Sequence, residues 1–191
     1  MFARILLVAL LALPLCGCLP TAVPLSKKNE ATPEGLVGAW KCIRSSEGDS
    51  IVSLSKDGSY YEVRNANSQK QDEAILVYKM VISKIANDLY ATLFLDVSKS
   101  SNLWPKETSS IVDVDMIPRC WTFKLELNGD NLKLLVWDEK NAKIEPEKYD
   151  ENVNILLLKS SEIRDLLAKD GAKAFKESEH FTFTRKKADS K

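Results

Sequence analysis

The chain has 191 residues, of which 45% are hydrophobic and 28% charged, and its 27 basic and 27 acidic residues give a formal net charge of zero. This balance excludes an intrinsically disordered chain, and the missing excess of positive charge argues against a nucleic-acid binder. The single histidine, His180, leaves little room for histidine-based catalysis or for a metal site with several histidine ligands. The length suits one domain.

Apolar residues are concentrated at the N-terminus. Arg4 is followed by an uninterrupted apolar run over 5–13, and Pro14 then breaks it. A short positive region before about nine apolar residues is typical of a secretory signal peptide, whereas a membrane-spanning helix needs roughly 20. We therefore expect residues 1–17 to be removed as a signal peptide; the alternative is a short buried helix of the domain.

The end of this segment, Leu15-Cys16-Gly17-Cys18, resembles the bacterial lipobox. Cys18 matches the lipid-bearing cysteine of that motif because the small Gly17 precedes it, whereas Cys16 would follow the bulky Leu15. The resemblance implies a diacylglycerol thioether on Cys18, usually with a further acyl chain such as palmitate on the new amino group, and two or more chains hold a protein firmly to a membrane. The residue after Cys18 is Leu19. In a Gram-negative cell envelope, the sorting rule of the lipobox family then implies that the mature protein is anchored in the outer membrane and faces the periplasm.

The mature chain is expected to have three parts. Residues 18–34 contain three prolines and several small or polar residues, which indicates a lipid-anchored flexible tether. Residues 35–187 form the domain, and 188–191 a polar tail. In that domain Cys42 and Cys120 are an even pair, which in an oxidising compartment favours a disulfide. However, Cys120 is out of phase with the apolar face of its strand, so two separate buried thiols are equally open.

The domain alternates short strands with tight turns. Asp57-Gly58 and Asn128-Gly129 are strong hairpin signals, and Asn87-Asp88 marks a further turn. Alternating or compact apolar segments predict about nine strands, with an unclear connection over 97–119; they lie within 35–43, 51–55, 60–64, 74–85, 89–97, 120–127, 132–137, 154–158 and 181–185.

One helix is expected late in the chain. Ser160 or Ser161 can cap its start, Glu162 favours its positive end, and Gly171 ends or breaks it. Its apolar face consists of Ile163, Leu166 and Leu167. Sequential hairpins with one late helix predict a mainly β fold, an antiparallel up-and-down barrel of about eight or nine strands, because closure removes exposed strand edges.

Gly38-Ala39-Trp40 resembles the Gly-X-Trp motif of the first lipocalin strand, and the hairpin at 56–60 and the helix–strand ending are similar to small bacterial lipocalin-like lipoproteins. In lipocalins this tryptophan plugs one barrel end beneath a late arginine. The resemblance therefore implies a cation–π contact between Trp40 and Arg185, with Arg164 as second candidate. Inward-facing residues expected to line a cavity are Tyr61, Val63, Phe123, Leu125 and Leu134.

The sequence favours a non-enzymatic, membrane-anchored barrel that binds a small apolar ligand or a cell-envelope partner. The alternative is a periplasmic protein inhibitor or envelope-assembly factor that acts through protein–protein contacts. Trp104, in the longest structureless stretch, is the candidate partner contact.

Enzyme chemistry has little support. His180 has no Gly-X-Ser-X-Gly nucleophile elbow to serve. Asp113 and Asp115 share one face of an extended segment and could bind calcium or act as a glycosidase pair, but a solvated strand face is the simpler interpretation. We expect no cofactor, no metal and no nucleic-acid partner.

Overall fold

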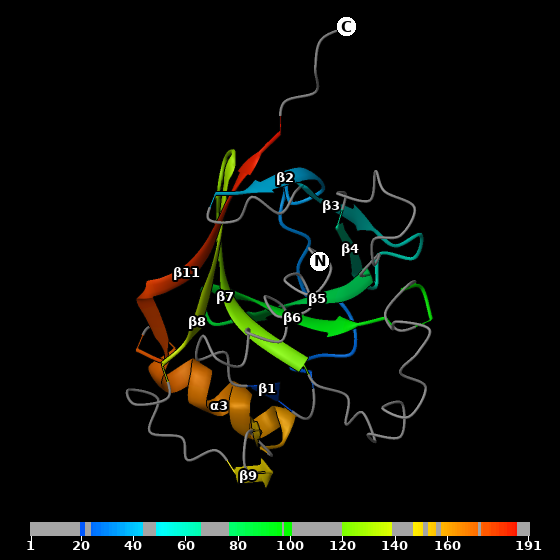
Figure 1. Cartoon of the computed structure of the whole chain (residues 1–191). Helices are drawn as coiled ribbons and strands as arrows, with labels where there is room; N and C mark the ends of the chain where they lie inside the picture. Colours follow the sequence, from blue (N-terminus) through cyan, green and yellow to red (C-terminus); the bar gives the residue numbers. More distant parts are fainter. Residues whose placement is uncertain are drawn as a thin grey trace, which may run out of the picture.

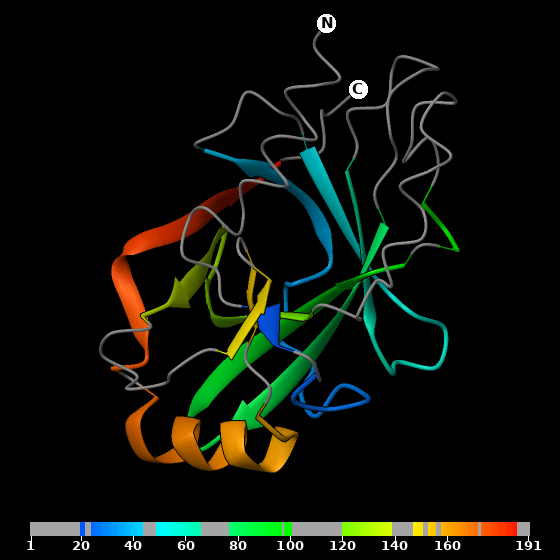
Figure 2. The ribbon, with the colours of Figure 1, turned by 60° about the horizontal axis from the view of Figure 1, so that its bottom comes forward.

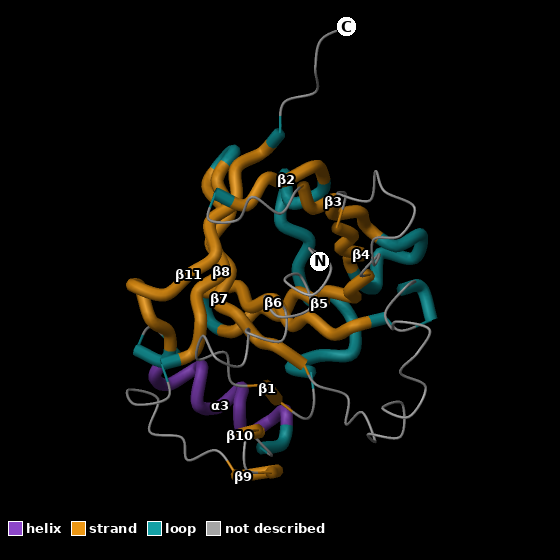
Figure 3. Tube along the Cα trace, in the orientation of Figure 1, coloured by secondary structure: helices purple, strands orange, loops and turns teal. Residues whose placement is uncertain are grey.

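The fold is a closed antiparallel barrel. The computed structural model describes residues 20–21, 24–43, 49–65, 77–96, 98–100, 120–138, 147–150, 153–155, 158–171 and 173–186. Eight strands in this part follow one another around a ring (Figures 1 and 3): β2 (Gly38–Cys42), β3 (Asp49–Leu54), β4 (Tyr61–Asn65), β5 (Val77–Ile85), β6 (Asp88–Leu95), β7 (Cys120–Asn128), β8 (Asn131–Trp137) and β11 (Phe175–Arg185). Pairing of β7 with β8 and of β11 with β2 closes the ring, which confirms the predicted up-and-down barrel.

Three tight turns lie at one end of the barrel, which we call the turn end. They join β3 to β4, β5 to β6 and β7 to β8, and Gly58 and Gly129 have the positive φ angles of 71° and 57° that such turns need. The β5–β6 turn consists of Ala86 and Asn87, one residue earlier than expected, because Ile85 pairs with Asp88. Since consecutive strands alternate in direction, the longer connections all leave from the opposite end, which we call the loop end.

The β3–β4 turn is built around the carboxylate of Asp57. Its Oδ1 accepts hydrogen bonds from Ser55 Oγ at 2.7 Å, Ser59 N at 3.0 Å and Ser59 Oγ at 2.8 Å. These bonds, first that from Ser55, lower the pKa of Asp57 from 3.8 to about 2. The carboxylate therefore favours the folded turn only while it is ionised.

Asp57→Asn should lower the melting temperature near neutral pH but not in strong acid. A carboxyl whose pKa is depressed on folding contributes stability above its unfolded pKa of 3.8, and this contribution is lost as the pH falls towards about 2. The gap in Tm between wild type and variant, measured by circular dichroism between pH 6 and pH 2, should therefore close at the acid end. A gap that stays constant would contradict this assignment.

The single predicted helix, α3 (Ser160–Asp170), lies across the outside of the barrel (Figure 2). Residues of β8 alternate, so that Leu134 and Val136 face the interior while Leu135 and Trp137 face the helix. Together with Ile163 and Leu167 of α3 they form an outer cluster, in which Trp137 stacks on Phe175 with ring centroids 4.7 Å apart; its other members are Leu25, Ile85, Tyr90 and Ala174. Among the described residues, no helix is long and apolar enough to cross a membrane.

The ends of α3 differ in one detail from the expectation. Gly171 ends the helix as predicted, and a side chain there would collide with the carbonyl of Leu167 and lie 2.5 Å from the Tyr90 hydroxyl. The N-cap is Lys159 rather than a serine, because Ser160 Oγ donates instead to the Leu25 carbonyl at 2.7 Å. Glu162 accepts a hydrogen bond from Lys159 N at 2.7 Å and so satisfies the first turn.

Residues 24–36, which we call the strap, are bound to the barrel, so the expectation of a flexible tether up to residue 34 is wrong for this part. Leu25 is 2% exposed in the outer cluster. Asn29 and Glu30 occupy the edge of β5 that β4 leaves free: Ile82 N donates to Asn29 Oδ1 at 2.9 Å, and Glu30 N donates to Ile82 O at 2.8 Å. Arg164 of α3 holds Glu30 in an ion pair at 2.8 Å.

The last part of the chain departs most from the predicted strands. Val153–Ile155 (β10) pairs with Glu147–Asp150 (β9) in a separate hairpin and contributes nothing to the barrel. Strand β11 begins at Phe175, six residues earlier than expected, and its register shifts between Lys176 and His180. This irregularity breaks the alternation of inward and outward residues, which is why the first half of β11 does not resemble a strand in the sequence.

Candidate functional site

The barrel interior holds the candidate site. Its wall consists of inward-facing side chains, here called the interior cluster, and all five predicted lining residues belong to it: Tyr61, Phe123, Leu125 and Leu134 are buried, and Val63 is half-buried against them. Phe123 of β7 and Phe181 of β11, on either side of β8, meet edge to face inside the barrel, with ring centroids 6.0 Å apart. Further members are Trp40, Val52, Met80, Ile82, Ala91, Leu132 and Val136. The interior is therefore an almost wholly apolar environment.

The turn end is plugged by Trp40 and Arg185, as the resemblance to lipocalins implies. Trp40 is fully buried, and its indole N–H donates to the Leu36 carbonyl at 2.9 Å. The Arg185 guanidinium carbon lies 4.4 Å from the centre of the Trp40 ring, which confirms the predicted cation–π contact. Arg164, the second candidate, is engaged with Glu30 instead.

Arg185 also ties the start of β2 to the β7–β8 turn. Its Nη1 donates to the Val37 carbonyl at 3.1 Å, its Nη2 donates to the Gly35 carbonyl, and its Nε pairs with Asp130 at 3.0 Å. A side chain at Gly38 would lie 2.6 Å from Nη1, and the φ of Gly38 is +145°. The glycine of the Gly-X-Trp motif is thus required both by its backbone and by the arginine packed against it.

Among the described residues, Trp121, Lys176 and Tyr78 are polar side chains that face the interior near the loop end; Tyr78 of β5 pairs with the inward-facing Val63. The indole nitrogen of Trp121 is buried, and no partner accepts its hydrogen. Trp121 itself is half-buried on the inner wall beside Leu93. Lys176 pairs with the inward-facing Val136, so the strand register places it on the inner face as well. The unpartnered Trp121 N–H therefore lies with the Tyr78 ring and Lys176 at this end of the wall, and Lys176 already has a partner of its own.

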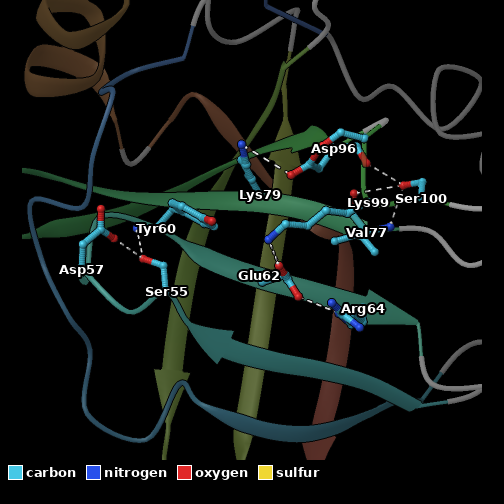
Figure 4. A network of polar contacts seen from close by, with 11 residues as sticks. Ser55, Asp57, Tyr60, Glu62, Arg64, Val77, Lys79, Asp96, Lys99 and Ser100 are labelled. Carbon is cyan, nitrogen blue, oxygen red and sulfur yellow. Dashed lines mark hydrogen bonds and ion pairs between the residues drawn. The ribbon is translucent and has the colours of Figure 1, made fainter.

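A polar network fastens the start of the long β6–β7 connection to the outer wall (Figure 4). Glu62 of β4 accepts from Lys99 at 2.5 Å and from Arg64 at 2.6 Å, and Lys79 of β5 lies 3.4 Å from Asp96. Ser100 Oγ donates to the Asp96 carbonyl at 2.8 Å and accepts from Val77 N at 3.0 Å. Asp96 and residues 98–100 are thus held by several bonds to one another and to β4 and β5.

The charged side chains of this network form ion pairs with one another. The hydrogen bond from Lys99, aided by Arg64, lowers the pKa of Glu62 despite partial burial. Burial acts to raise the pKa of Asp96, but the hydrogen bond from Ser98 and the charge of Lys79 together lower it. We regard the network as structural. The sequence alone does not reveal this network, because it shows only the outward alternation of Glu62 and Arg64, and their partners are distant along the chain.

Cys42 and Cys120 are not joined by a disulfide, so that alternative is corrected. Cys42 lies on β2 opposite Phe183, and Cys120 lies on β7 opposite Phe94. Because β8 and β11 separate β7 from β2 on one side of the ring, the two cysteines stand on strands that are not neighbours. Burial raises the pKa of the Cys120 thiol from 9.0 to about 11.

Alkylation should distinguish the two thiols. At pH 7.5 iodoacetamide should modify the partly exposed Cys42 well before Cys120, which is 2% exposed and needs a deprotonated sulfur to react. In urea without reductant both should react. Peptide mass spectrometry of the native and unfolded chain measures this, and protection of both cysteines in urea would indicate a bridge instead.

Of the remaining candidates from the sequence, the structure describes His180 alone. Cys18, Trp104, Asp113 and Asp115 lie outside the described residues. His180 pairs with Leu135 on the outer side, and its Nδ1 lies 2.8 Å from the Glu177 carbonyl. Within the described ranges, no three histidine, cysteine or acidic side chains gather so that they could hold a metal ion.

No known family model matches the chain, and comparisons with curated proteins and with solved structures also give no match. The barrel and its plugged end therefore stand on the chain's own geometry.

Proposed function

We propose that this protein is a membrane-anchored lipoprotein whose barrel binds a small apolar or amphipathic molecule without catalysing a reaction. The observation that carries the proposal is the interior cluster, an apolar wall sealed at the turn end by Trp40 and Arg185. Binding sites for small hydrophobic molecules are lined mainly by apolar side chains with few polar groups. The lipobox supports the anchor on Cys18, and Leu19 supports an outer-membrane, periplasm-facing location in a Gram-negative cell.

The polar groups near the loop end suggest the chemistry of the ligand. A buried indole N–H without a partner favours a ligand that offers a hydrogen-bond acceptor, because an unmade buried hydrogen bond costs free energy. A molecule with an apolar body and a carboxylate or phosphate end supplies such an acceptor.

Fluorescence titration with a dansylated long-chain fatty acid tests this proposal. We expect saturable binding to the wild type and roughly fivefold weaker binding to Trp121→Phe, since one hydrogen bond is worth about 1 kcal/mol. Trp137→Phe is the matched control: its N–H is also buried and unpartnered, but it belongs to the outer cluster. No saturable binding by the folded wild type, or equal effects of the two variants, would overturn the proposed site.

Binding of an envelope protein is the second candidate. Three exposed aliphatic side chains lie beside β2 or on β3. They are Val37, Ile43 and Ile51, which are 50%, 59% and 45% exposed. Exposed apolar groups of this kind favour contact with a partner when they are contiguous. Retention of one envelope protein by the immobilised wild type, lost with Ile51→Lys, together with no uptake of the fatty acid, would favour this function over ligand binding.

A further inference from the structure

The N-terminal end of the described chain pairs with a strand of the barrel. Pro20–Thr21 (β1) pairs with the start of β7, Pro20 opposite Trp121 and Thr21 opposite Cys120. The β7–β8 pairing extends only to Lys124 and Leu135, so β1 takes the edge of β7 that β8 leaves free. The first described residues of the chain are therefore part of the barrel wall.

This wall segment lies towards the loop end. Strand β7 runs from Cys120 to its tight turn at Gly129, and that turn defines the turn end. The residues that pair with β1 are the first two of β7, at the opposite extremity of the strand. Pro20 and Thr21 thus mark the rim of the barrel where the long connections leave.

The chain between Cys18 and this rim is short. Two residues span at most about 7 Å between Cα atoms. Beyond β1, Leu25 is buried in the outer cluster, and the strap is bonded to β5 and to Arg164 of α3. Even if β1 detached, at most about 25 Å of chain would separate Cys18 from Leu25.

We propose that the lipid on Cys18 holds the loop end of the barrel directly against the bilayer surface, with the turn end pointing away. This inference rests on the lipid anchor of the proposed function and adds an orientation to it. A flexible tether would let the barrel rotate freely, whereas an anchor within two residues of a paired strand fixes one rim towards the membrane. An amphipathic ligand would then pass between bilayer and interior without crossing water.

Photo-cross-linking to lipid tests the orientation. Acylated full-length protein is placed in vesicles of phosphatidylethanolamine and phosphatidylglycerol, with p-benzoylphenylalanine in place of either Lys173 or Lys56. Both lysines are exposed; Lys173 precedes β11 at the loop end, and Lys56 lies in the β3–β4 turn. We expect several-fold more lipid adduct from position 173 than from position 56, measured by mass spectrometry of proteins shown to be folded by circular dichroism.

A Gly-Ser linker inserted between Cys18 and Leu19 is the matched control, because it keeps the lipid but frees the barrel. It should bring the two adduct yields together. Equal yields without the linker, or a higher yield at position 56, would overturn the orientation while leaving the anchor intact. An intact mass that shows no acyl group on Cys18 would overturn the anchor and the orientation together.

Discussion

Trp40→Ala should lower the free energy of unfolding by about 4 kcal/mol, since replacing a buried tryptophan by alanine costs 3–5 kcal/mol in close-packed cores. Trp40 is fully buried at the turn end, and its indole contacts the interior cluster on one side and Arg185 on the other. The substitution removes apolar burial and leaves the Leu36 carbonyl without its indole donor. Urea unfolding followed by circular dichroism measures the loss.

Two further variants separate the contributions at this position. Trp40→Phe keeps an aromatic ring beneath Arg185 but removes the bond to Leu36, and should cost about 2 kcal/mol. Val37→Ala alters a neighbouring side chain that is 50% exposed, and should change stability by less than about 0.5 kcal/mol. A loss below about 1 kcal/mol for Trp40→Ala would show that the tryptophan does not plug the barrel.

The barrel could be predicted because the sequence signals that specify its turns and strands are local. The tight turns have their own chemistry, such as Gly129 with its positive φ, and the barrel strands other than β11 show period-two alternation. The strap could not be predicted, because Asn29 and Glu30 resemble ordinary linker residues. Their partner is the edge of β5 beyond Met80, which β4 leaves unpaired because β4 begins at Tyr61.

The structure of β10 and β11 could not be predicted, because their strand pairing is irregular or local. The register shift between Lys176 and His180 puts Phe175 on the outer side and Phe181 on the inner side, which no constant period can reproduce. The compact apolar segment at 154–158 satisfies the pattern of a core strand, yet β10 (Val153–Ile155), which overlaps its start, pairs with a local hairpin partner. Within the site, the family resemblance supplied the Trp40–Arg185 contact, whereas the unpartnered N–H of Trp121 emerges only from the packing around it.

Arg185 and Arg164 provide a direct test of how much a single arginine contributes at the plugged end. Arg185→Met should lower the free energy of unfolding by about 3 kcal/mol, because hydrogen bonds to charged groups contribute 1.5–3 kcal/mol and a cation–π contact adds up to about 2. The methionine keeps part of the aliphatic packing on Trp40 but leaves the carbonyls of Gly35 and Val37 without their donor.

Arg164→Met removes the same charge from the surface of α3. Its ion pair with Glu30 is about one-third exposed on both sides, so we expect a loss below about 1 kcal/mol that shrinks in high salt. The larger loss in Arg185→Met should persist in salt, since it arises from bonds to backbone carbonyls and from the buried ring. Equal losses in the two variants, measured by urea unfolding in low and high salt, would mean that Arg185 acts only as a surface charge and that Trp40 seals the turn end alone.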